Sequence, residues 1–528
     1  MSESIVTLTA SNGETVQFSD KIIATGGMKD VYASPGNRYV VAFYRSQLDD
    51  AARQRLEMIT GAYRERIFDN EQGAYWDQLF CWPTATVEHN GRTGVVAPFY
   101  RDHFFFEHGS FNNDMLKIQG KDKEGKWFAS PNNQFKFLDE RERGNWLNYL
   151  QLCLRLSRAV RRLHAAGLAH SDLSYKNVLL APTSGNVCII DMDGLVVPDR
   201  FPPEVVGTPD FIAPECVVTS HLDKKDPKRI LPSILTDRHA LAVMVYTLLL
   251  LRHPLRGQKM HAEDPSEDER LTMGEKALFI EHPTDNSNRL AVNDTTKPTE
   301  LPWKDLKELP YSVTGPYLKD LFDRAFISGL HDPSNRPSAD EWEVALVKTV
   351  DLIQPCQNSR CQQGWFVFDN TTAPRCPFCG TRYHGRLPLI NLYSARGNRY
   401  RPDNHRLMVY SKQSVFPWHI DRTIVPNERL GNEQKSRVGY FVLHQSRWFL
   451  VNENMPQLKN AKTGEGVPIG GKVELKDGLQ LLTGASPTHR LFFPANGSGI
   501  IWEELRFTLS SGKQLSFSST KCSMRSVF

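Results

Sequence analysis

Residues 170–215, HSDLSYKNVLLAPTSGNVCIIDMDGLVVPDRFPPEVVGTPDFIAPE, contain polar residues whose spacing points to one site. The segment opens with H-x-D-x-x-x-x-N, in which Asp172 can accept the proton of an attacking hydroxyl and Asn177 can reach a metal ion. The apolar, β-branched run at 187–190 predicts a short buried strand that brings Asp191 to the same metal. One base and two metal ligands would then lie together.

Further motifs complete this stretch and follow it along the chain. Residues 207–209 give G-T-P and residues 213–215 give A-P-E, Asp237 opens a long apolar segment, and DPSNRP covers 332–337. In this order the motifs resemble those of a eukaryotic-type protein kinase domain. The resemblance implies an ATP- and Mg²⁺-dependent Ser/Thr protein kinase. It also implies a buried ion pair between Arg336 and the glutamate of A-P-E.

Length and composition indicate several ordinary globular domains. The chain has 528 residues, 23% charged and 10% aromatic residues and a net charge of +4. This length suits about three or four domains. Because the net charge is small and dispersed, we expect no nucleic-acid partner. The longest apolar run, 240–251, is too short to span a bilayer, and the N-terminus lacks the layout of a signal peptide, so we expect a cytoplasmic protein without a membrane span.

The resemblance predicts a bilobal α+β domain with a small lobe at 1–100 and a large lobe at 101–352. Gly26 and Gly27 would form the turn between two strands that covers the phosphates of ATP, because backbone N–H groups come close where side chains are absent. Ala97 lies in a segment that resembles the hinge, whose backbone would bond adenine.

The strand predicted at 39–45, YVVAFYR, lacks the lysine that holds the nucleotide phosphates in the family. Lys29 lies instead in the preceding glycine-rich hairpin, at the position used by With-No-Lysine kinases. Because alternate residues of a strand face the same side, Lys29 can point into the same pocket. We therefore predict that Lys29 binds the phosphates. The alternative is a solvated Lys29 with Arg45 reaching inward.

The spacing of apolar residues predicts a helix over 48–68, which should supply the glutamate that orients the phosphate lysine. We choose Glu57 and keep Glu65 as the alternative, because the spacing does not decide between two acids on one helix.

The metal-binding motif is Asp191-Met192-Asp193-Gly194 in place of D-F-G. Asp191 directly follows the apolar run, so it is the predicted Mg²⁺ ligand together with Asn177, since Mg²⁺ prefers oxygen ligands. Asp193 is either a second ligand or a loop acid, and we favour the loop acid because turns are rich in aspartate.

The catalytic loop departs from the family at two positions. Ser171 replaces the arginine that normally reads a phosphate on the activation loop, and no Ser, Thr or Tyr occurs from 192 to 207. We therefore expect an active state that needs no phosphorylation in that interval. Ser174 replaces a lysine that serves the γ-phosphate. Lys176 lies four residues after Asp172, where tyrosine kinases carry an arginine, and is the predicted substitute cation.

A cysteine cluster at 353–385 predicts a zinc ribbon. The spacing C-x₄-C followed by C-x₂-C supplies four thiolates for a closed, tetrahedral Zn²⁺ site, and iron is chemically possible with the same ligands. The four predicted ligands are Cys356, Cys361, Cys376 and Cys379.

Residues 386–528 alternate in polarity between Gly, Asn and Pro turns, which predicts a β-sandwich. The order Arg422, Ser436-Arg437 and Asn460 weakly resembles a forkhead-associated domain, whose loops bind phosphothreonine. A glycine stands where that family has a histidine after the Ser-Arg pair.

The order of kinase, zinc ribbon and forkhead-like domain resembles bacterial kinases of tellurite-resistance and stress operons. This resemblance implies a protein substrate and two partners, a von Willebrand factor A protein and a metal-dependent Ser/Thr phosphatase. The alternatives are a pseudokinase scaffold that binds nucleotide and partner proteins without phosphoryl transfer, and a kinase of small molecules. The G-T-P and A-P-E segment favours a protein substrate.

Overall fold

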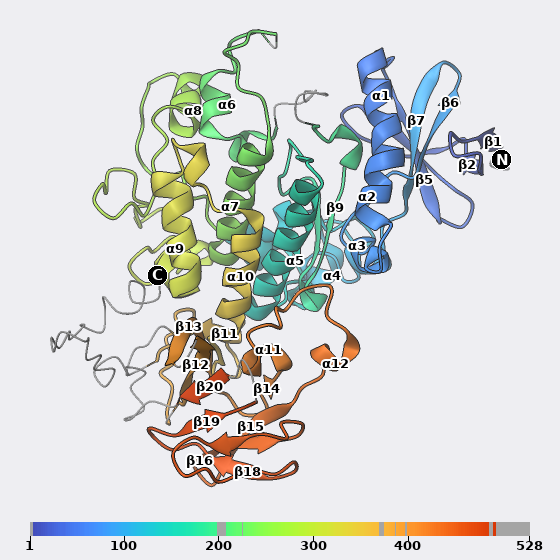
Figure 1. The fold of residues 1–528 in the computed structure, drawn as a ribbon. Coiled ribbons are helices and arrows are strands. Elements are labelled where there is room, and N and C mark those ends of the chain that lie inside the picture. Colours follow the sequence, from blue (N-terminus) through green and yellow to red (C-terminus); the bar gives the residue numbers. More distant parts are fainter. Residues whose placement is uncertain are drawn as a thin grey trace. The chain divides into compact units, whose positions relative to one another are not determined.

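The computed structural model of the chain contains two compact units. The first comprises Met1–Tyr311 and Asp320–Val344, and the second comprises Ser312–Lys319 and Ala345–Phe528. The structure describes residues 4–197, 207–223, 225–368, 374–385, 387–396, 399–484 and, for the backbone alone, 489–492. Within these ranges, no helix combines the length and apolar character needed to cross a bilayer. The segments predicted as zinc ribbon and β-sandwich fall within one unit (Figure 1).

The β-rich part of the first unit is a five-stranded antiparallel sheet in the order β3-β4-β5-β7-β6. Its strands are β3 (Ile22–Thr25), β4 (Lys29–Ala33), β5 (Tyr39–Tyr44), β6 (Ala85–His89) and β7 (Arg92–Pro98). A separate hairpin of β1 (Ile5–Thr9) and β2 (Thr15–Ser19) comes before them in the chain. Because neighbouring residues of a strand face opposite sides, Phe43 belongs to the cluster with Phe18 on one face of the sheet. Tyr44 packs with Leu56 on the other face.

The helix predicted at 48–68 is interrupted. It consists of α1 (Asp50–Met58), a π-helical turn at Ile59–Tyr63, and α2 (Arg64–Phe68), and α3 (Gly73–Trp76) follows. The Asp49 side chain caps α1 by accepting a hydrogen bond of 2.8 Å from the Ala52 backbone N–H. Gly61 has φ −103° and ψ −105°, which breaks the regular helical path. The inward-facing residues of α1 are Ala52, Arg55 and Leu56.

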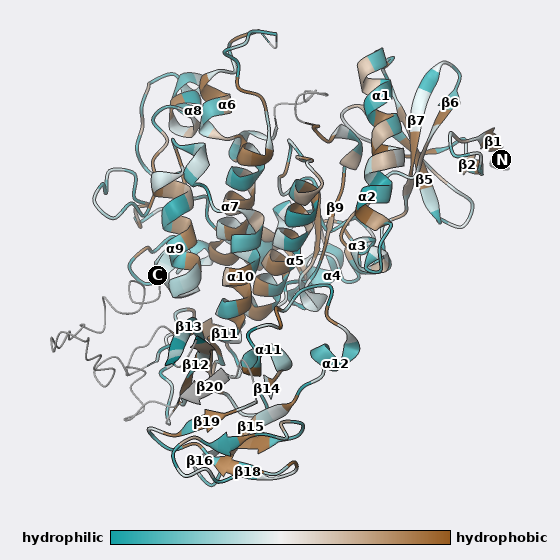
Figure 2. Ribbon diagram, in the orientation of Figure 1, coloured by the Kyte–Doolittle hydropathy of each residue, from teal (hydrophilic) through white to brown (hydrophobic). Residues whose placement is uncertain are grey.

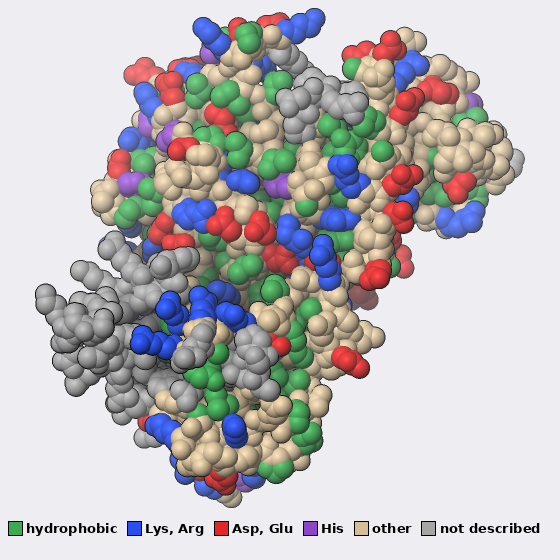
Figure 3. Space-filling view, viewed as in Figure 1, with side chains coloured by type: hydrophobic (Ala, Val, Ile, Leu, Met, Phe, Trp, Pro, Cys, Tyr) green, Lys and Arg blue, Asp and Glu red, His purple; other side chains and the backbone are tan. Residues whose placement is uncertain are grey.

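Two long helices, α5 (Trp146–Ala165) and α7 (Ile234–Leu250), form the core of the helical part of the first unit. Helix α5 has an apolar side and a polar side (Figure 2), and it packs beside α7, whose side chains are buried along most of its length. The Asn145 and Asn148 side chains each accept the other's backbone N–H, at 3.1 and 3.0 Å, and so fix the start of α5. Acidic and basic side chains are interspersed over the face of the unit in Figure 3.

Shorter helices and strands accompany α5 and α7 in the chain before residue 351. They are α4 (Phe111–Asp114), β8 (Val178–Ala181), β9 (Asn186–Ile189), α6 (Pro214–Val218), α8 (Pro265–Met273), α9 (Pro316–Asp323) and α10 (Ala339–Val350). Strands β8 and β9 pair antiparallel, and β9 confirms the strand that was predicted before Asp191.

The second unit contains two larger antiparallel sheets, in the orders β13-β12-β20-β19-β17 and β14-β15-β16-β18. Side chains from both sheets, including Leu392, Phe441 and Leu450, share one hydrophobic core. The elements of the unit after α10 are β10 (Ile353–Pro355), β11 (Trp365–Val367), β12 (Leu389–Arg396), β13 (Arg399–Met408), β14 (Ser414–Val415), α11 (Pro417–Ile420), α12 (Asn432–Lys435), β15 (Gly439–His444), β16 (Arg447–Asn452), β17 (Lys459–Asn460), β18 (Lys472–Glu474), β19 (Gln480–Leu482) and β20 (His489–Phe492).

Candidate active site and metal centre

A cavity of about 730 Å³ lies in the first unit between the five-stranded sheet and the loops around β8 and β9. This volume is typical of sites that bind small molecules. Seven of the predicted site residues line it: Gly26, Gly27, Lys29, Ala97, Asp172, Asn177 and Asp191. Residues that are distant in the sequence, and that were predicted from separate motifs, therefore border one space.

Asp237, in the first turn of α7, holds the backbone of the catalytic loop in place just before Asp172. Its carboxylate accepts hydrogen bonds from the backbone N–H groups of His170, at 2.7 Å, and Ser171, at 3.1 Å. Ser171 has a φ of 69°, a left-handed conformation that is costly for a residue with a Cβ and is held here by the two bonds. The His170 Nε2 atom lies 2.9 Å from the Ile190 carbonyl oxygen, which links this loop to the end of β9.

Asp172 is oriented through both of its carboxylate oxygens. Oδ1 accepts a hydrogen bond from the Thr208 hydroxyl at 2.8 Å, and Oδ2 accepts one from the Asn177 side-chain amide at 2.8 Å. The Thr208 hydroxyl also lies 3.2 Å from the Ser174 hydroxyl. A carboxylate held in this way at the edge of the cavity can accept a proton from a substrate hydroxyl.

Lys29 points into the cavity, as predicted. It lies directly across the β4–β5 ladder from Tyr44, and its side chain is 19% exposed. Its Nζ atom donates to Asp191 Oδ1 at 2.9 Å and to the two Asp193 oxygens at 2.8 and 2.7 Å. Burial disfavours the ammonium, but the charges of Asp193 and Asp191 outweigh burial and raise the pKa of Lys29 above its ordinary value.

Asp193, interpreted from the sequence as a loop acid, lies in the turn Met192–Gly194 but is buried there. Its side chain is 6% exposed, and the Tyr44 hydroxyl donates a hydrogen bond to it. Burial favours the neutral acid, but the Lys29 ammonium and the Tyr44 hydroxyl hold the pKa of Asp193 below its ordinary value. Sequence reasoning also missed the contact made by Tyr44, which with Phe43 is one of the two strand positions where the resemblance places a lysine.

The predicted helix glutamate is a second correction. Glu57 and its alternative Glu65 are both exposed, and neither is a partner of Lys29, whose bonded acids are Asp191 and Asp193. The reason is the phase of α1, because the adjacent Leu56 faces inward and therefore turns Glu57 outward.

The other two candidate cations lie outside the cavity lining. Arg45 donates hydrogen bonds to the carbonyl oxygens of Gly26 and Gly27, so it holds the glycine hairpin from outside instead of reaching inward. Lys176 is exposed, and its predicted contact with the γ-phosphate stays a prediction.

The expected ion pair between Arg336 and Glu215 is confirmed. Two parallel hydrogen bonds of 2.7 Å join the guanidinium to the carboxylate, and the Arg336 side chain is 0% exposed. The guanidinium also donates to the Gly329 carbonyl at 2.8 Å. Most of the interval without Ser, Thr or Tyr, residues 198–206, lies outside the described residues.

Two residues can offer oxygen atoms to Mg²⁺. The Asp191 side chain is 49% exposed and has an αL backbone, with φ 60° and ψ 44°. The amide nitrogen of Asn177 donates to Asp172, which leaves its oxygen as the ligand atom. Oxygen donors of this kind fit a hard, small cation.

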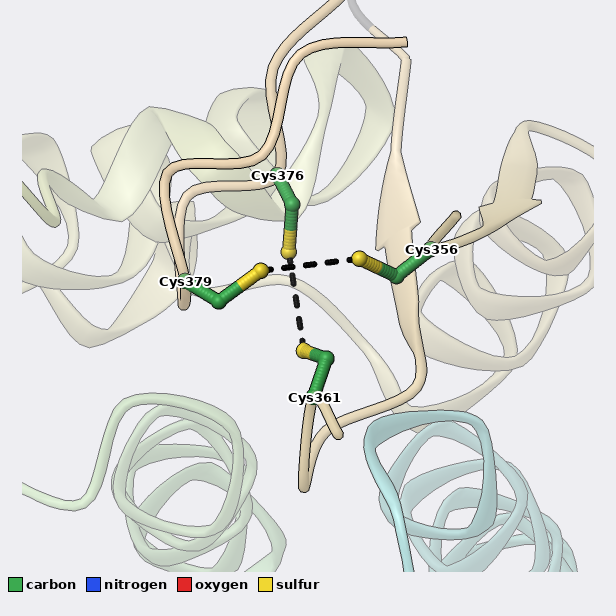
Figure 4. Close-up of side chains that lie close together, drawn as sticks. All are labelled: Cys356, Cys361, Cys376 and Cys379. Atoms are coloured by element: carbon green, nitrogen blue, oxygen red, sulfur yellow. Dashed lines mark hydrogen bonds between the residues drawn. The ribbon is translucent and has the colours of Figure 1, made fainter. Parts of the chain in front are cut away.

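In the second unit, the four predicted zinc ligands converge on one point (Figure 4). The sulfur atoms of Cys356 and Cys379 are 3.5 Å apart, and those of Cys361 and Cys376 are 3.8 Å apart. A tetrahedron with Zn–S bonds of about 2.3 Å has edges of about 3.8 Å. The four thiols therefore fit Zn²⁺, and the pairing of β10 with β11 brings the first two cysteines into place.

The loops of the second unit give less support to phosphothreonine binding. Arg437 forms a 2.7 Å ion pair with Glu453, and the Asn460 side chain accepts the backbone N–H of Lys462 at 2.9 Å. A Cβ at Gly439 would lie 2.5 Å from the Val451 carbonyl oxygen, so the histidine of the forkhead-associated family does not fit at that position. Binding of phosphothreonine stays a prediction.

Residues 132–343 match the family model of the protein kinase domain. The chain is similar to that family over these residues. It is 26% identical over 161 residues to serine/threonine-protein kinase PknD from Chlamydia muridarum, covering 26% of this chain and 16% of that protein. It is 29% identical over 113 residues to serine/threonine-protein kinase Pkn1 from Myxococcus xanthus, covering 20% of this chain and 15% of that protein. Both relatives are serine/threonine-protein kinases by name.

The extent of these similarities is limited. The chain covers about one sixth of the length of these relatives, so the activity, substrates and partners of the whole proteins are not transferred. Among solved structures, the chain is similar to the Toxoplasma gondii specific rhoptry antigen kinase domain, with 13% identity and a TM-score of 0.38 over 66% of this chain and 86% of that one. A similarity at this level is too low to support a conclusion.

Proposed function

We propose that this chain is an ATP- and Mg²⁺-dependent protein serine/threonine kinase. The observation that carries the proposal is the convergence of the oriented base Asp172, the cation Lys29 and the ligand pair Asn177 and Asp191 on a single cavity. A base, a phosphate-binding cation and two metal ligands are the parts that phosphoryl transfer requires.

In the proposed reaction, Asp172 accepts the proton of a substrate serine or threonine hydroxyl. The hydroxyl oxygen forms a bond to the γ-phosphorus of ATP, and the bond from that phosphorus to the β–γ bridging oxygen breaks, so that ADP leaves. Lys29 neutralises phosphate charge, and Gly26 and Gly27 bring backbone N–H groups to the phosphates. Asn177 and Asp191 would hold Mg²⁺, which supplies further charge neutralisation when bound.

The finer parts of the proposal rest on the sequence resemblance together with the geometry. Lys29 replaces the absent strand lysine as in With-No-Lysine kinases, and Lys176 serves the γ-phosphate. The cysteine segment is a zinc ribbon with a structural Zn²⁺, and the domain predicted at 386–528, of which 493–528 lie outside the described residues, is a forkhead-like β-sandwich. The chain acts in bacterial stress signalling in the cytoplasm, with a von Willebrand factor A protein and a metal-dependent Ser/Thr phosphatase as partners.

The test is transfer of labelled phosphate from ATP to the chain itself and to the two proposed partners. The wild-type chain is expected to label protein in the presence of Mg²⁺. The Asp172→Ala variant is expected to lower the rate by roughly 10²- to 10⁴-fold, because it loses the general base. Glu57→Gln, on the exposed side of α1, is the matched acid control and should keep the wild-type rate. Nucleotide binding without any labelling would favour the pseudokinase scaffold.

A further inference from the structure

The loop after β9 supplies the acids that bond Lys29. In the family, a glutamate of the helix beside the sheet orients the phosphate lysine. Here the inward face of α1 carries Ala52, Arg55 and Leu56, and both candidate glutamates of the helix are exposed. An acid with the same task must therefore come from another element.

We propose that Asp193 is the positioning residue that holds Lys29 in the nucleotide site, in place of the helix glutamate. This proposal rests on the proposed function. Its support is geometric. Asp193 is 6% exposed, and both of its oxygens accept hydrogen bonds from the Lys29 ammonium, at 2.8 and 2.7 Å. The Tyr44 hydroxyl donates a further hydrogen bond and fixes the carboxylate from the strand β5.

The two acids of this loop, Asp191 and Asp193, differ in how exposed they are to solvent, and this difference assigns them different roles. Asp191 is 49% exposed and meets Lys29 through one oxygen, at 2.9 Å. An exposed carboxylate that makes one contact can turn to a metal ion at little cost, whereas a buried one that loses its partners pays a large desolvation penalty. We assign Asp191 to the metal and Asp193 to Lys29.

Tyr44 explains how this arrangement fits the sheet. A lysine at its position would point into the same space as Lys29, because the two residues face each other across the β4–β5 ladder. The tyrosine instead supplies a hydroxyl to Asp193, and its ring centroid lies 5.2 Å from the Lys29 ammonium. The phosphate cation is thereby tied to the metal-binding loop, and its position does not depend on a charged residue of α1.

The experiment is a double-mutant cycle on the full chain, with the dissociation constant for ATP measured by titration in Mg²⁺ and in EDTA. The variants are Lys29→Met, Asp193→Asn and the double variant. Asp193→Asn is expected to raise the dissociation constant for ATP by roughly tenfold or more, as for a lost charged hydrogen bond. The same substitution should have no further effect in the Lys29→Met background. Asp193→Glu should restore part of the wild-type affinity.

Two controls make the outcomes distinct. Glu57→Gln and Glu65→Gln should bind ATP as the wild type does, and a large loss in either variant would overturn the proposal. An effect of Asp193→Asn that is equally large in both backgrounds would also overturn it, because Asp193 would then act as a metal ligand or as a structural acid.

The same cycle on thermal unfolding without nucleotide separates this proposal from the proposed function. The decrease in Tm of the double variant should be smaller than the sum of the two single decreases, because either substitution alone breaks the pair. A wild type that binds no ATP but retains this coupling would contradict the proposed function alone. Additive decreases in Tm would contradict the role of Asp193.

Discussion

Lys29 and Tyr44 are paired residues on adjacent strands, and both side chains reach Asp193 on the far side of the cavity. Tyr44 is one of the two positions, with Phe43, where the resemblance places a lysine, and Lys29 lies on the neighbouring strand. Directly opposed residues of an antiparallel pair lie on the same face of a sheet. The Lys29 and Tyr44 side chains therefore both border the cavity.

Thr208 should orient the catalytic base, since its hydroxyl donates to Asp172 Oδ1 at 2.8 Å. Thr208→Val removes this bond at nearly constant volume and is expected to lower kcat by about tenfold, the effect of roughly one lost hydrogen bond to a charged group. The KM for ATP should change little, and Thr208→Ser should restore the rate. Equal kcat values for wild type and Thr208→Val in steady-state labelling would contradict this role.

The Arg336–Glu215 pair should contribute strongly to stability. Arg336→Gln leaves the Glu215 carboxylate without its bidentate partner in a largely buried site, and removal of one member of such a pair costs about 3–5 kcal/mol. Urea unfolding of the variant provides the measurement. The control is Arg101→Gln, which breaks an ion pair with Asp77 whose side chains are 47% and 54% exposed and should change stability little. Equal effects of the two substitutions would refute the prediction.

Zinc should bind to the four-cysteine cluster. We expect about one zinc ion per chain by elemental analysis, and loss of most of it in Cys361→Ser, because a tetrahedral site needs all four thiolates. Cys81→Ala is the control for zinc content, since burial raises the pKa of the Cys81 thiol to about 12 and Cys81 is not one of the four clustered cysteines. Iron in place of zinc, or unchanged zinc in Cys361→Ser, would refute the assignment.

Acid should destabilise the chain through His253. Its Nδ1 accepts the Leu255 N–H at 3.2 Å and its Nε2 donates to the Asp210 carbonyl at 2.9 Å, so the folded ring is neutral. Burial lowers the pKa of His253 to about 4, whereas an unfolded histidine has a pKa of about 6.5. The unfolded chain therefore binds the extra proton first. The stability from this group is present above pH 6.5 or so and is lost as the pH falls.

The expected size is about 2 kcal/mol less stability at pH 5 than at pH 7 from this histidine. Urea unfolding at the two pH values should show a smaller decrease for His253→Gln than for the wild type. The same decrease in both proteins would mean that His253 is not held neutral.

The sequence was sufficient where chemistry depends on fixed spacing. The loop with Asp172 and Asn177, the strand before Asp191 and the cysteine pairs all fold locally, so their spacing already determines their geometry. The inward direction of Lys29 also followed from strand alternation alone.

The spacing of residues along the sequence did not predict which acids would be buried and which exposed. Asp193 lies in a turn, and turns usually expose aspartate, but here the carboxylate is buried and forms an ion pair with a lysine 164 positions earlier. Glu57 lies in a helix whose phase depends on which neighbours pack inward, and Leu56 and Arg55 take those places. Such contacts are long-range, so no local pattern reveals them.

The central claim is that Lys29 supplies the phosphate-binding cation of an active kinase. The most direct measurement is the rate of phosphate transfer from labelled ATP by wild type, Lys29→Met and Arg45→Met under the same Mg²⁺ conditions. The account predicts that Lys29→Met loses the activity by roughly 10²-fold or more, as when a preorganised charge is removed, while Arg45→Met retains most of it. Full activity in Lys29→Met with loss in Arg45→Met would contradict it.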